Sequence, residues 1–280
     1  MVLAIDVGAT KTAWALSEAE GALGPIERRP TRDVPSLLQE IVSAHAKSVD
    51  AIGISLVGHV DSSGLQWKEA LTIAGSYPQD LMALTSLPLS IDNDLKAATL
   101  AEQVHGWGRT YSEVLCLNLG SGVSLGVISG GILQRGSANY SGEVGHMPVW
   151  DGEAYRPLEQ LLGGLGIQSY LAGHGIDGGA EELFRQSVLR DQKAGERVVF
   201  LREVLVNLLV ALIHLYNPQC VSLSGSLALQ EQLTDSLETE VRSRLLRVSE
   251  ESLHVIAPSR LGARESSLLG ASQLAWEELQ

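Results

Sequence analysis

The sequence predicts an α/β protein in which one domain is duplicated and the two copies face each other across a cleft. Three observations favour this fold class. A Gly-containing turn between two short apolar strands occurs twice, strands alternate with helical segments, and the 280 residues, 45% of them hydrophobic, are enough for a large core in one or two lobes. A short peptide module and a disordered chain are therefore excluded.

The two turns have matching sequences. The first separates apolar runs at residues 1–5 and 12–16, and the second separates runs at 114–119 and 123–128. The turns read Ile5-Asp6-Val7-Gly8-Ala9-Thr10 and Leu117-Asn118-Leu119-Gly120-Ser121-Gly122. Each pattern indicates strand, tight turn and strand. Gly-rich hairpins are common, so the match alone is weak evidence for a duplicated domain. The further strands and helices that follow each copy strengthen it.

The remaining segments alternate as βα units do. Apolar residues at helical spacing predict helices at 35–48, 94–104, 194–216 and 268–279, and short apolar runs predict strands at 51–56, 89–92 and 220–223. Asn217-Pro218 ends the third helix. No low-complexity linker separates the halves, so we expect a hinge near Trp107. The predicted lobes are 1–106, joined by the C-terminal helix 268–280, and 107–267.

Charge disfavours two classes of partner. The chain has 20 Lys and Arg against 33 Asp and Glu, a net charge of −13. The summed field repels nucleic-acid backbones and anionic lipid surfaces, so we expect neither partner. A local phosphate pocket is still allowed, because backbone N–H groups and one Lys act at short range while the diffuse charge is screened within roughly 8–10 Å.

The sequence carries no mark of export. Cys116 and Cys220 lie in apolar stretches without CxxC spacing, so a disulfide framework is not expected. The first 16 residues include Asp6 and Lys11 and lack the features of a signal peptide. No stretch approaches the ~18 uncharged apolar residues of a membrane span. We therefore expect a soluble cytoplasmic protein.

Both glycine turns are suited to phosphate binding. Gly8 and Thr10 let the backbone approach a ligand, Lys11 adds positive charge, and Asp6 is placed to hold Mg²⁺ through water. Gly120, Ser121 and Gly122 supply N–H donors and a hydroxyl. Together the turns could clamp a polyphosphate for phosphoryl transfer. The GxxxxGK[ST] pattern of a P-loop is absent, and a purely structural hairpin is the alternative.

Two further groups carry candidate chemistry. At the strand-to-helix junction Asp92-Asn93-Asp94, a carboxylate could take a proton from an attacking hydroxyl while the amide orients a second hydroxyl. The alternative is that these residues only cap the helix, and Asp94 can do both. The carboxylates and imidazole of Glu143, His146 and Glu159 could bind sugar hydroxyls. A metal site is the alternative, although HExxH spacing is absent, and a lone His is more often a core residue.

In order along the chain, these motifs resemble those of the ROK family of bacterial sugar kinases and repressors. The motifs are Asp6–Lys11, Gly53–Asp61, Asn93-Asp94 with Ala97, Ala98 and Glu102, Gly120–Gly122, Gly130, Gly136, Gly142–His146, Leu223–Ser226 and Gly270-Ala271. The family belongs to the actin/hexokinase/Hsp70 fold class. The resemblance, which runs from residue 3 to the C-terminus, implies a two-lobed ribonuclease H-like/actin-like ATPase fold with a central interlobe cleft.

The resemblance also implies residue roles. Asp94 corresponds to the family's general base, and the other sugar contacts correspond to Asn93, Glu143, His146 and Glu159. Asp6, Gly8, Thr10 and Lys11 resemble the first phosphate motif, Gly120, Ser121 and Gly122 the second, and Gly225 part of the adenosine motif. The implied cofactors are ATP and Mg²⁺, and the implied assembly is a homodimer.

Several departures from the family pattern bear on the metal and the sugar. Most members have a zinc site built from the equivalent of His146 and a CxCGxxGC segment, but residues 147–159 contain no cysteine, so we expect no zinc and expect Trp150 and Tyr155 to order the loop. Lys96 replaces an Asn, and Ser55–Gly58 replaces Gly-x-Pro-Gly. The segment 71–77 lacks the usual Pro-Asn-Leu. These changes argue against plain glucose and leave amino sugars, N-acetylmannosamine and cyclitols open.

The leading hypothesis is an ATP- and Mg²⁺-dependent kinase acting on a hydroxyl of a hexose or hexose-like substrate, with Asp94 as base. The first alternative is a catalytically weak sugar-sensing protein that acts through a protein partner, without the N-terminal helix-turn-helix of the family's repressors. The second is a glucokinase that uses polyphosphate as donor.

Overall fold

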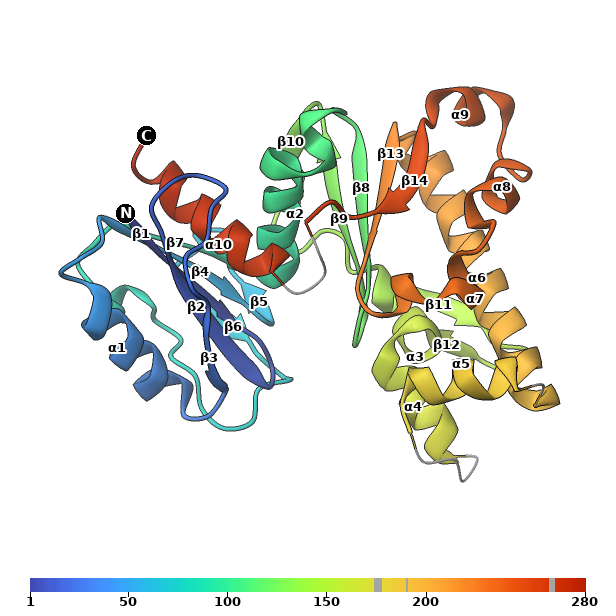
Figure 1. Ribbon diagram of the computed structural model, residues 1–280, viewed down its shortest axis with the longest axis horizontal. Helices are drawn as coiled ribbons and strands as arrows, with labels where there is room; N and C mark the ends of the chain where they lie inside the picture. The colour runs from blue at the N-terminus through green and yellow to red at the C-terminus, as the bar shows by residue number, and fades with distance from the viewer. Residues whose placement is uncertain (174–177, 190, 262–264) are drawn as a thin grey trace. The chain divides into compact units, whose positions relative to one another are not determined.

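The computed structural model describes residues 1–173, 178–189, 191–261 and 265–280 (Figure 1). The chain divides into two compact units. Unit 1 consists of Met1–Arg109, Leu133–Ser141 and Arg264–Gln280, and unit 2 of Thr110–Ile132 and Gly142–Ala263. This division differs from the predicted lobes at Leu133–Ser141, a segment of the predicted second lobe that makes its contacts with unit 1.

The sheet of unit 1 has the strand order β3-β2-β1-β4-β7. Its strands are β1 (Val2–Val7), β2 (Lys11–Ser17), β3 (Glu27–Pro30), β4 (Ala51–Leu56) and β7 (Leu89–Asn93). The strands β1, β2 and β3 are antiparallel, and β4 and β7 continue the sheet parallel to β1. A separate ribbon pairs β5 (His59–Val60) with β6 (Trp67–Glu69).

The sheet of unit 2 repeats this plan in the order β10-β9-β8-β13-β14. Its strands are β8 (Val114–Leu119), β9 (Val123–Ser129), β10 (Ile132–Leu133), β13 (Cys220–Ser224) and β14 (Val255–Pro258). Again the first two strands form an antiparallel hairpin, and two later strands add in parallel to the first. The repeated turn motif therefore opens two sheets of equivalent topology. A second ribbon, β11 (Pro148–Trp150) with β12 (Tyr155–Pro157), lies in the same unit.

Helices cover both faces of the first sheet (Figure 1). They are α1 (Val34–His45), α2 (Asp94–His105) and α10 (Ser266–Glu277), with the 3₁₀ turns η1 (Met82–Leu84) and η2 (Trp107–Arg109). Neighbouring side chains of β1 point to opposite faces: Leu3 and Ile5 pack in the core that includes α1, whereas Ala4 packs against α10. The C-terminal helix is thus part of unit 1.

The closest backbone approaches of unit 1 are made by α10. A Cβ atom at Gly53 of β4 would lie 1.8 Å from the carbonyl oxygen of Ala271, and a Cβ at Gly270 would lie 1.9 Å from the carbonyl oxygen of Ala97 in α2. Only glycine permits such contact between a helix and a neighbouring backbone. The glycine at 53 therefore lets α10 pack directly on β4, and the glycine at 270 lets it pack directly on α2.

The core of unit 2 is formed around α6 (Gln192–Tyr216), whose buried leucines pack with Leu117, Leu119 and Val221 of the sheet. The other helical elements are α3 (Leu158–Leu162), α4 (Gly164–Gly173), α5 (Ala180–Val188), α7 (Glu231–Thr234), α8 (Leu237–Arg242), α9 (Arg247–Ser252), η3 (Val144–His146) and η4 (Leu227–Leu229). Helix α6 ends where Asn217 adopts a left-handed conformation, before Pro218.

Helix α6 is also more apolar than we expected from the sequence. Among the described residues it alone is long and apolar enough to cross a membrane by length and composition, with a window of mean hydropathy 2.1. Half of that window is buried within the protein. The buried residues of the helix pack with the sheet and with neighbouring helices, whereas Val199 and Leu215 of the same helix are exposed.

We predict that Gly53→Ala lowers the free energy of unfolding of unit 1 by about 2–4 kcal/mol, because the new methyl group would overlap the backbone of α10. The matched control is Gly195→Ala in α6, where a Cβ would meet no atom within 4 Å. That change should stabilise the protein by about 0.5–1 kcal/mol. Differential scanning calorimetry of both variants checks the pair, and equal melting temperatures would contradict the proposed helix contact.

Candidate functional site

The first glycine turn connects β1 to β2 in unit 1. The backbone N–H of Gly8 donates to the carbonyl oxygen of Lys11 at 3.0 Å, and the side chains of Thr10 and Lys11 are exposed. Thr31, which follows β3, fixes the turn: its hydroxyl donates to the carbonyl oxygen of Gly8 at 2.8 Å, and its N–H donates to that of Thr10 at 2.9 Å. Thr31 could not be recognised from the sequence, because its role depends on the pairing of β2 with β3.

Asp6 lies near the end of β1 beside this turn. The hydroxyl of buried Ser55 in β4 donates to Asp6 Oδ1 at 2.8 Å. Burial raises the pKa of Asp6 to about 6, and the Ser55 hydrogen bond opposes this shift only in part. A nearby Mg²⁺ would favour the ionised carboxylate.

The described residues include no group of three or more His, Cys, Asp or Glu side chains able to hold a metal ion together. A single carboxylate such as that of Asp6 can hold Mg²⁺ through water, since this ion usually keeps several waters and takes one or two carboxylates.

The second glycine turn connects β8 to β9 in unit 2 and is fixed by the start of α4. The N–H of Gly164 donates to the carbonyl oxygen of Gly120 at 2.8 Å, and the N–H of Leu165 donates to that of Ser121 at 3.0 Å. Gly225, with φ of 88°, lies directly against the turn: a Cβ there would be 2.3 Å from the carbonyl oxygen of Leu119. The structure thus brings the predicted second phosphate motif and the predicted adenosine motif together.

The junction between β7 and α2 holds Asn93 and Asp94. Asn93 caps the helix, because its Oδ1 accepts from the N–H groups of Leu95 at 3.0 Å and Lys96 at 3.2 Å. Its Nδ2 donates to the carbonyl oxygen of Gly58 at 2.8 Å and to Asp94 Oδ1 at 2.9 Å. Asp94 Oδ1 also accepts from the N–H of Leu95 at 2.9 Å. The cap therefore orients the Asp94 carboxylate.

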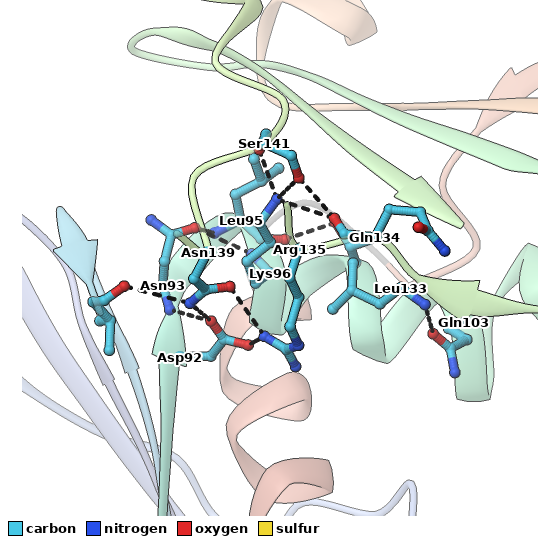
Figure 2. Close-up of polar contacts among 12 residues, drawn as sticks. Asp92, Asn93, Leu95, Lys96, Gln103, Leu133, Gln134, Arg135, Asn139 and Ser141 are labelled. Atoms are coloured by element: carbon cyan, nitrogen blue, oxygen red, sulfur yellow. Dashed lines mark hydrogen bonds and ion pairs between the residues drawn. The ribbon is translucent and has the colours of Figure 1, made fainter. Parts of the chain in front are cut away.

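The buried carboxylate of Asp92 forms hydrogen bonds and an ion pair next to this junction. Asp92, at the end of β7, accepts from the N–H of Asn93 at 2.9 Å and from Asn139 Nδ2 at 2.9 Å, and it forms an ion pair with Arg135 (Figure 2). Arg135 and Asn139 were not predicted from the sequence. Their contacts join residues more than forty positions apart, and no short motif marks them.

The three remaining predicted sugar contacts lie in unit 2. Glu143 precedes η3, and its carbonyl oxygen accepts from the N–H of His146, whose side chain is exposed. Glu159 is in the first turn of α3. A Cβ at Gly122 would lie 3.2 Å from Glu159 Oε2, and one at Gly145 would lie 3.3 Å from the same oxygen. The Glu159 carboxylate therefore lies beside both the second glycine turn and η3.

The loop between η3 and α3 is ordered by a small hairpin. Trp150 pairs with Tyr155 across β11 and β12, with the two rings edge to face at 5.3 Å. Asp151 Oδ1 accepts from the N–H groups of Glu153 and Ala154, and Asp151 also pairs with Arg156. These donors, the Ala154 N–H foremost, hold the pKa of Asp151 well below its usual range. The expectation that Trp150 and Tyr155 order the loop stays a prediction.

The described cysteines lie elsewhere in the fold. Cys116 is on β8 and Cys220 on β13, where the two strands pair in parallel. Neither belongs to the loop that contains β11 and β12. The contacts described within this loop are the Trp150–Tyr155 ring pair and those of the Asp151 carboxylate.

Two equivalent sheets, each with a glycine turn in its first hairpin, are the architecture of an actin-like ATPase. A model of the ROK family matches residues 2–278, and the chain belongs to that family. The N-acetylmannosamine kinase of Escherichia coli O127:H6 is 28% identical over 295 residues, covering 99% of this chain and 98% of the relative.

Solved structures agree with this assignment. The ROK hexokinase of Thermus thermophilus is similar with a TM-score of 0.81 and 25% identity, over 99% of this chain and 98% of that one. The ROK family glucokinase of Streptomyces griseus, solved with glucose and AMPPNP, has a TM-score of 0.76 and 24% identity over 99% of both chains. The predicted family and the predicted actin-like α/β fold class are confirmed.

We predict that Asp151→Ala loosens the hairpin and raises amide hydrogen exchange in residues 147–157 by about tenfold, because it removes hydrogen bonds that fix the turn. Glu153→Ala is the matched control, since the Glu153 carboxylate makes no hydrogen bond or ion pair within the described residues. Mass spectrometry of exchange at neutral pH compares the two. Equal protection in both variants would show that Asp151 does not order the loop.

Proposed function

We propose that this chain transfers the γ-phosphoryl group of ATP to a hydroxyl of a hexose or hexose-like substrate, with Asp94 as the general base. The observation that carries the proposal is the placement of Asp94 at the start of α2. Its Oδ1 is held by Asn93 Nδ2 and by the N–H of Leu95. A carboxylate fixed in this way can accept the proton of an attacking hydroxyl without first reorganising.

The phosphate end of the reaction needs positioning and neutralisation of charge rather than covalent chemistry. We assign this to Gly8, Thr10 and Lys11 of the first turn and to Gly120–Gly122 of the second, with Gly225 beside the adenosine. Exposed Lys11 supplies positive charge and the glycine backbones admit close approach. Asp6 would hold Mg²⁺, which shields the phosphate oxygens. ATP is the donor to test first, because the S. griseus relative was solved with AMPPNP.

For the sugar we propose contacts with Asn93, Glu143, His146 and Glu159. Carboxylates, an amide and an imidazole offer the acceptors and donors that hydroxyl groups require. The relative at 28% identity is an N-acetylmannosamine kinase, so this amino sugar is the first substrate to test. The proposed enzyme acts in the cytoplasm, as the cysteine usage and the lack of signal-peptide features indicate, and as a homodimer, as the family resemblance implies.

We predict that Asp94→Asn lowers kcat by about 10²-fold or more while the affinity for the sugar is largely kept, because only the proton acceptor is lost. The substrate is first selected by thermal stabilisation of the protein with AMPPNP and N-acetylmannosamine, glucose, other amino sugars or cyclitols. ADP release is then measured at saturating substrate. Asp191→Asn is the matched control, since Asp191 also lies at a helix start and caps α6.

Wild-type turnover by Asp94→Asn would refute the assignment of the base. The same assay separates the alternatives. Sugar-dependent ADP release at ordinary rates contradicts a sensor without catalysis, and turnover with polyphosphate in place of ATP would identify the second donor.

A further inference from the structure

Lys96 is a buried lysine in the first turn of α2, two residues after the proposed base. Its side chain is 1% exposed. The Nζ atom donates to the carbonyl oxygen of Ser141 at 2.6 Å, to the Ser141 hydroxyl at 2.9 Å and to the carbonyl oxygen of Gln134 at 3.4 Å (Figure 2). An ammonium removed from water is tolerated only where oxygen atoms replace its hydration, and these acceptors do so.

The acceptors of Lys96 belong to residues 134 and 141, the two ends of a loop in unit 1 that we call the 134–141 loop; its neck is where these two ends meet. The N–H of Ser141 donates to the carbonyl oxygen of Arg135 at 3.1 Å, and the Ser141 hydroxyl donates to the carbonyl oxygen of Gln134 at 2.8 Å. Residues 134 and 141 therefore lie side by side, and one ammonium contacts both sides of the neck. Removing it would leave the carbonyl oxygen of Ser141 without this donor, whereas that of Gln134 would keep the Ser141 hydroxyl.

Three other residues of the loop hold it to the end of β7 and to β5. Asn139 and Arg135 bind the Asp92 carboxylate, and the Tyr140 ring meets the His59 ring edge to face at 4.7 Å. The loop is thus held at residue 92 and at residue 96, on both sides of Asp94 in the sequence. Ser141 is where the chain leaves unit 1, and Gly142 and Glu143 follow it directly.

We propose that Lys96 is a positioning residue for the sugar: it anchors Ser141 and thereby restricts Glu143. This inference rests on the proposed function, in which Glu143 contacts the substrate. Two residues of chain span at most about 7 Å, so a fixed Ser141 limits where Glu143 can lie. The Lys96 ammonium donates to Ser141 and Gln134, and this segment connects it to Glu143 along the chain.

Lys96→Met tests the proposal, because it keeps a long apolar stem and removes the charged donor. We expect amide exchange in residues 134–146 to rise by about tenfold or more, and the KM for the sugar to rise by about tenfold, as expected for loss of hydrogen bonds to a charged group. The KM for ATP and kcat should change by less than about threefold, because Asp94 and the phosphate turns keep their contacts.

Two further variants accompany it. Ser141→Ala removes the hydroxyl, which accepts from Lys96 and donates to the carbonyl oxygen of Gln134, but keeps the carbonyl acceptor of Ser141. It should shift exchange and the KM for the sugar in the same direction by a smaller factor, and it keeps the proposal testable should Lys96→Met not fold. Lys47→Met is the control, since Lys47 is exposed and its side chain forms no hydrogen bond within the described residues. It should behave as the wild type.

Unchanged exchange in residues 134–146 of both Lys96→Met and Ser141→Ala overturns the anchoring, whether or not the wild type is a kinase. Faster exchange with an unchanged sugar KM, or with kcat lowered instead, overturns the link to the sugar. Absence of any sugar phosphorylation by the wild type refutes the proposed function itself, and the exchange measurement then still decides whether Lys96 anchors Ser141.

Discussion

The side chain of Asn93 determines the direction of the Asp94 carboxylate, and the surroundings of unit 1 hold Asn93 in place. Its Oδ1 caps α2, and its Nδ2 binds both Gly58 and Asp94. One side chain thus ends β7, starts α2 and connects the junction to the segment after β4. The buried Asp92 fixes the backbone of Asn93 from the strand side. Gly53 of β4 and Gly270 of α10 allow α10 to lie directly against β4 and α2.

Local patterns in the sequence predicted much of the fold. The strand at 51–56 and the hairpin of β8 with β9 were found where apolar runs and glycine turns indicated them. Helix ends were less accurate: α1 ends at His45 rather than Ser48, and α10 begins at Ser266. The predicted equivalence of the two turns is matched by the equivalent strand orders of the two sheets.

The supporting residues of the site could not be predicted in the same way. Thr31 reaches the first turn through the pairing of β2 with β3, and Arg135 and Asn139 reach Asp92 from a loop more than forty residues away. Lys96 was recognisable as a departure from the family pattern, but its acceptors on residues 134 and 141 depend on tertiary structure. Contacts between distant segments carry no local signal, since neither residue has an unusual neighbourhood in the sequence.

The most direct measurement is the kinetics of Asn93→Ser. Serine is a good helix cap, so the melting temperature should stay close to that of the wild type, but it has no amide group to hold Asp94. If Asn93 aims the base, kcat at saturating sugar falls by about tenfold or more, in addition to any rise in the KM for the sugar. A stable variant with wild-type kcat would contradict the central role of this junction.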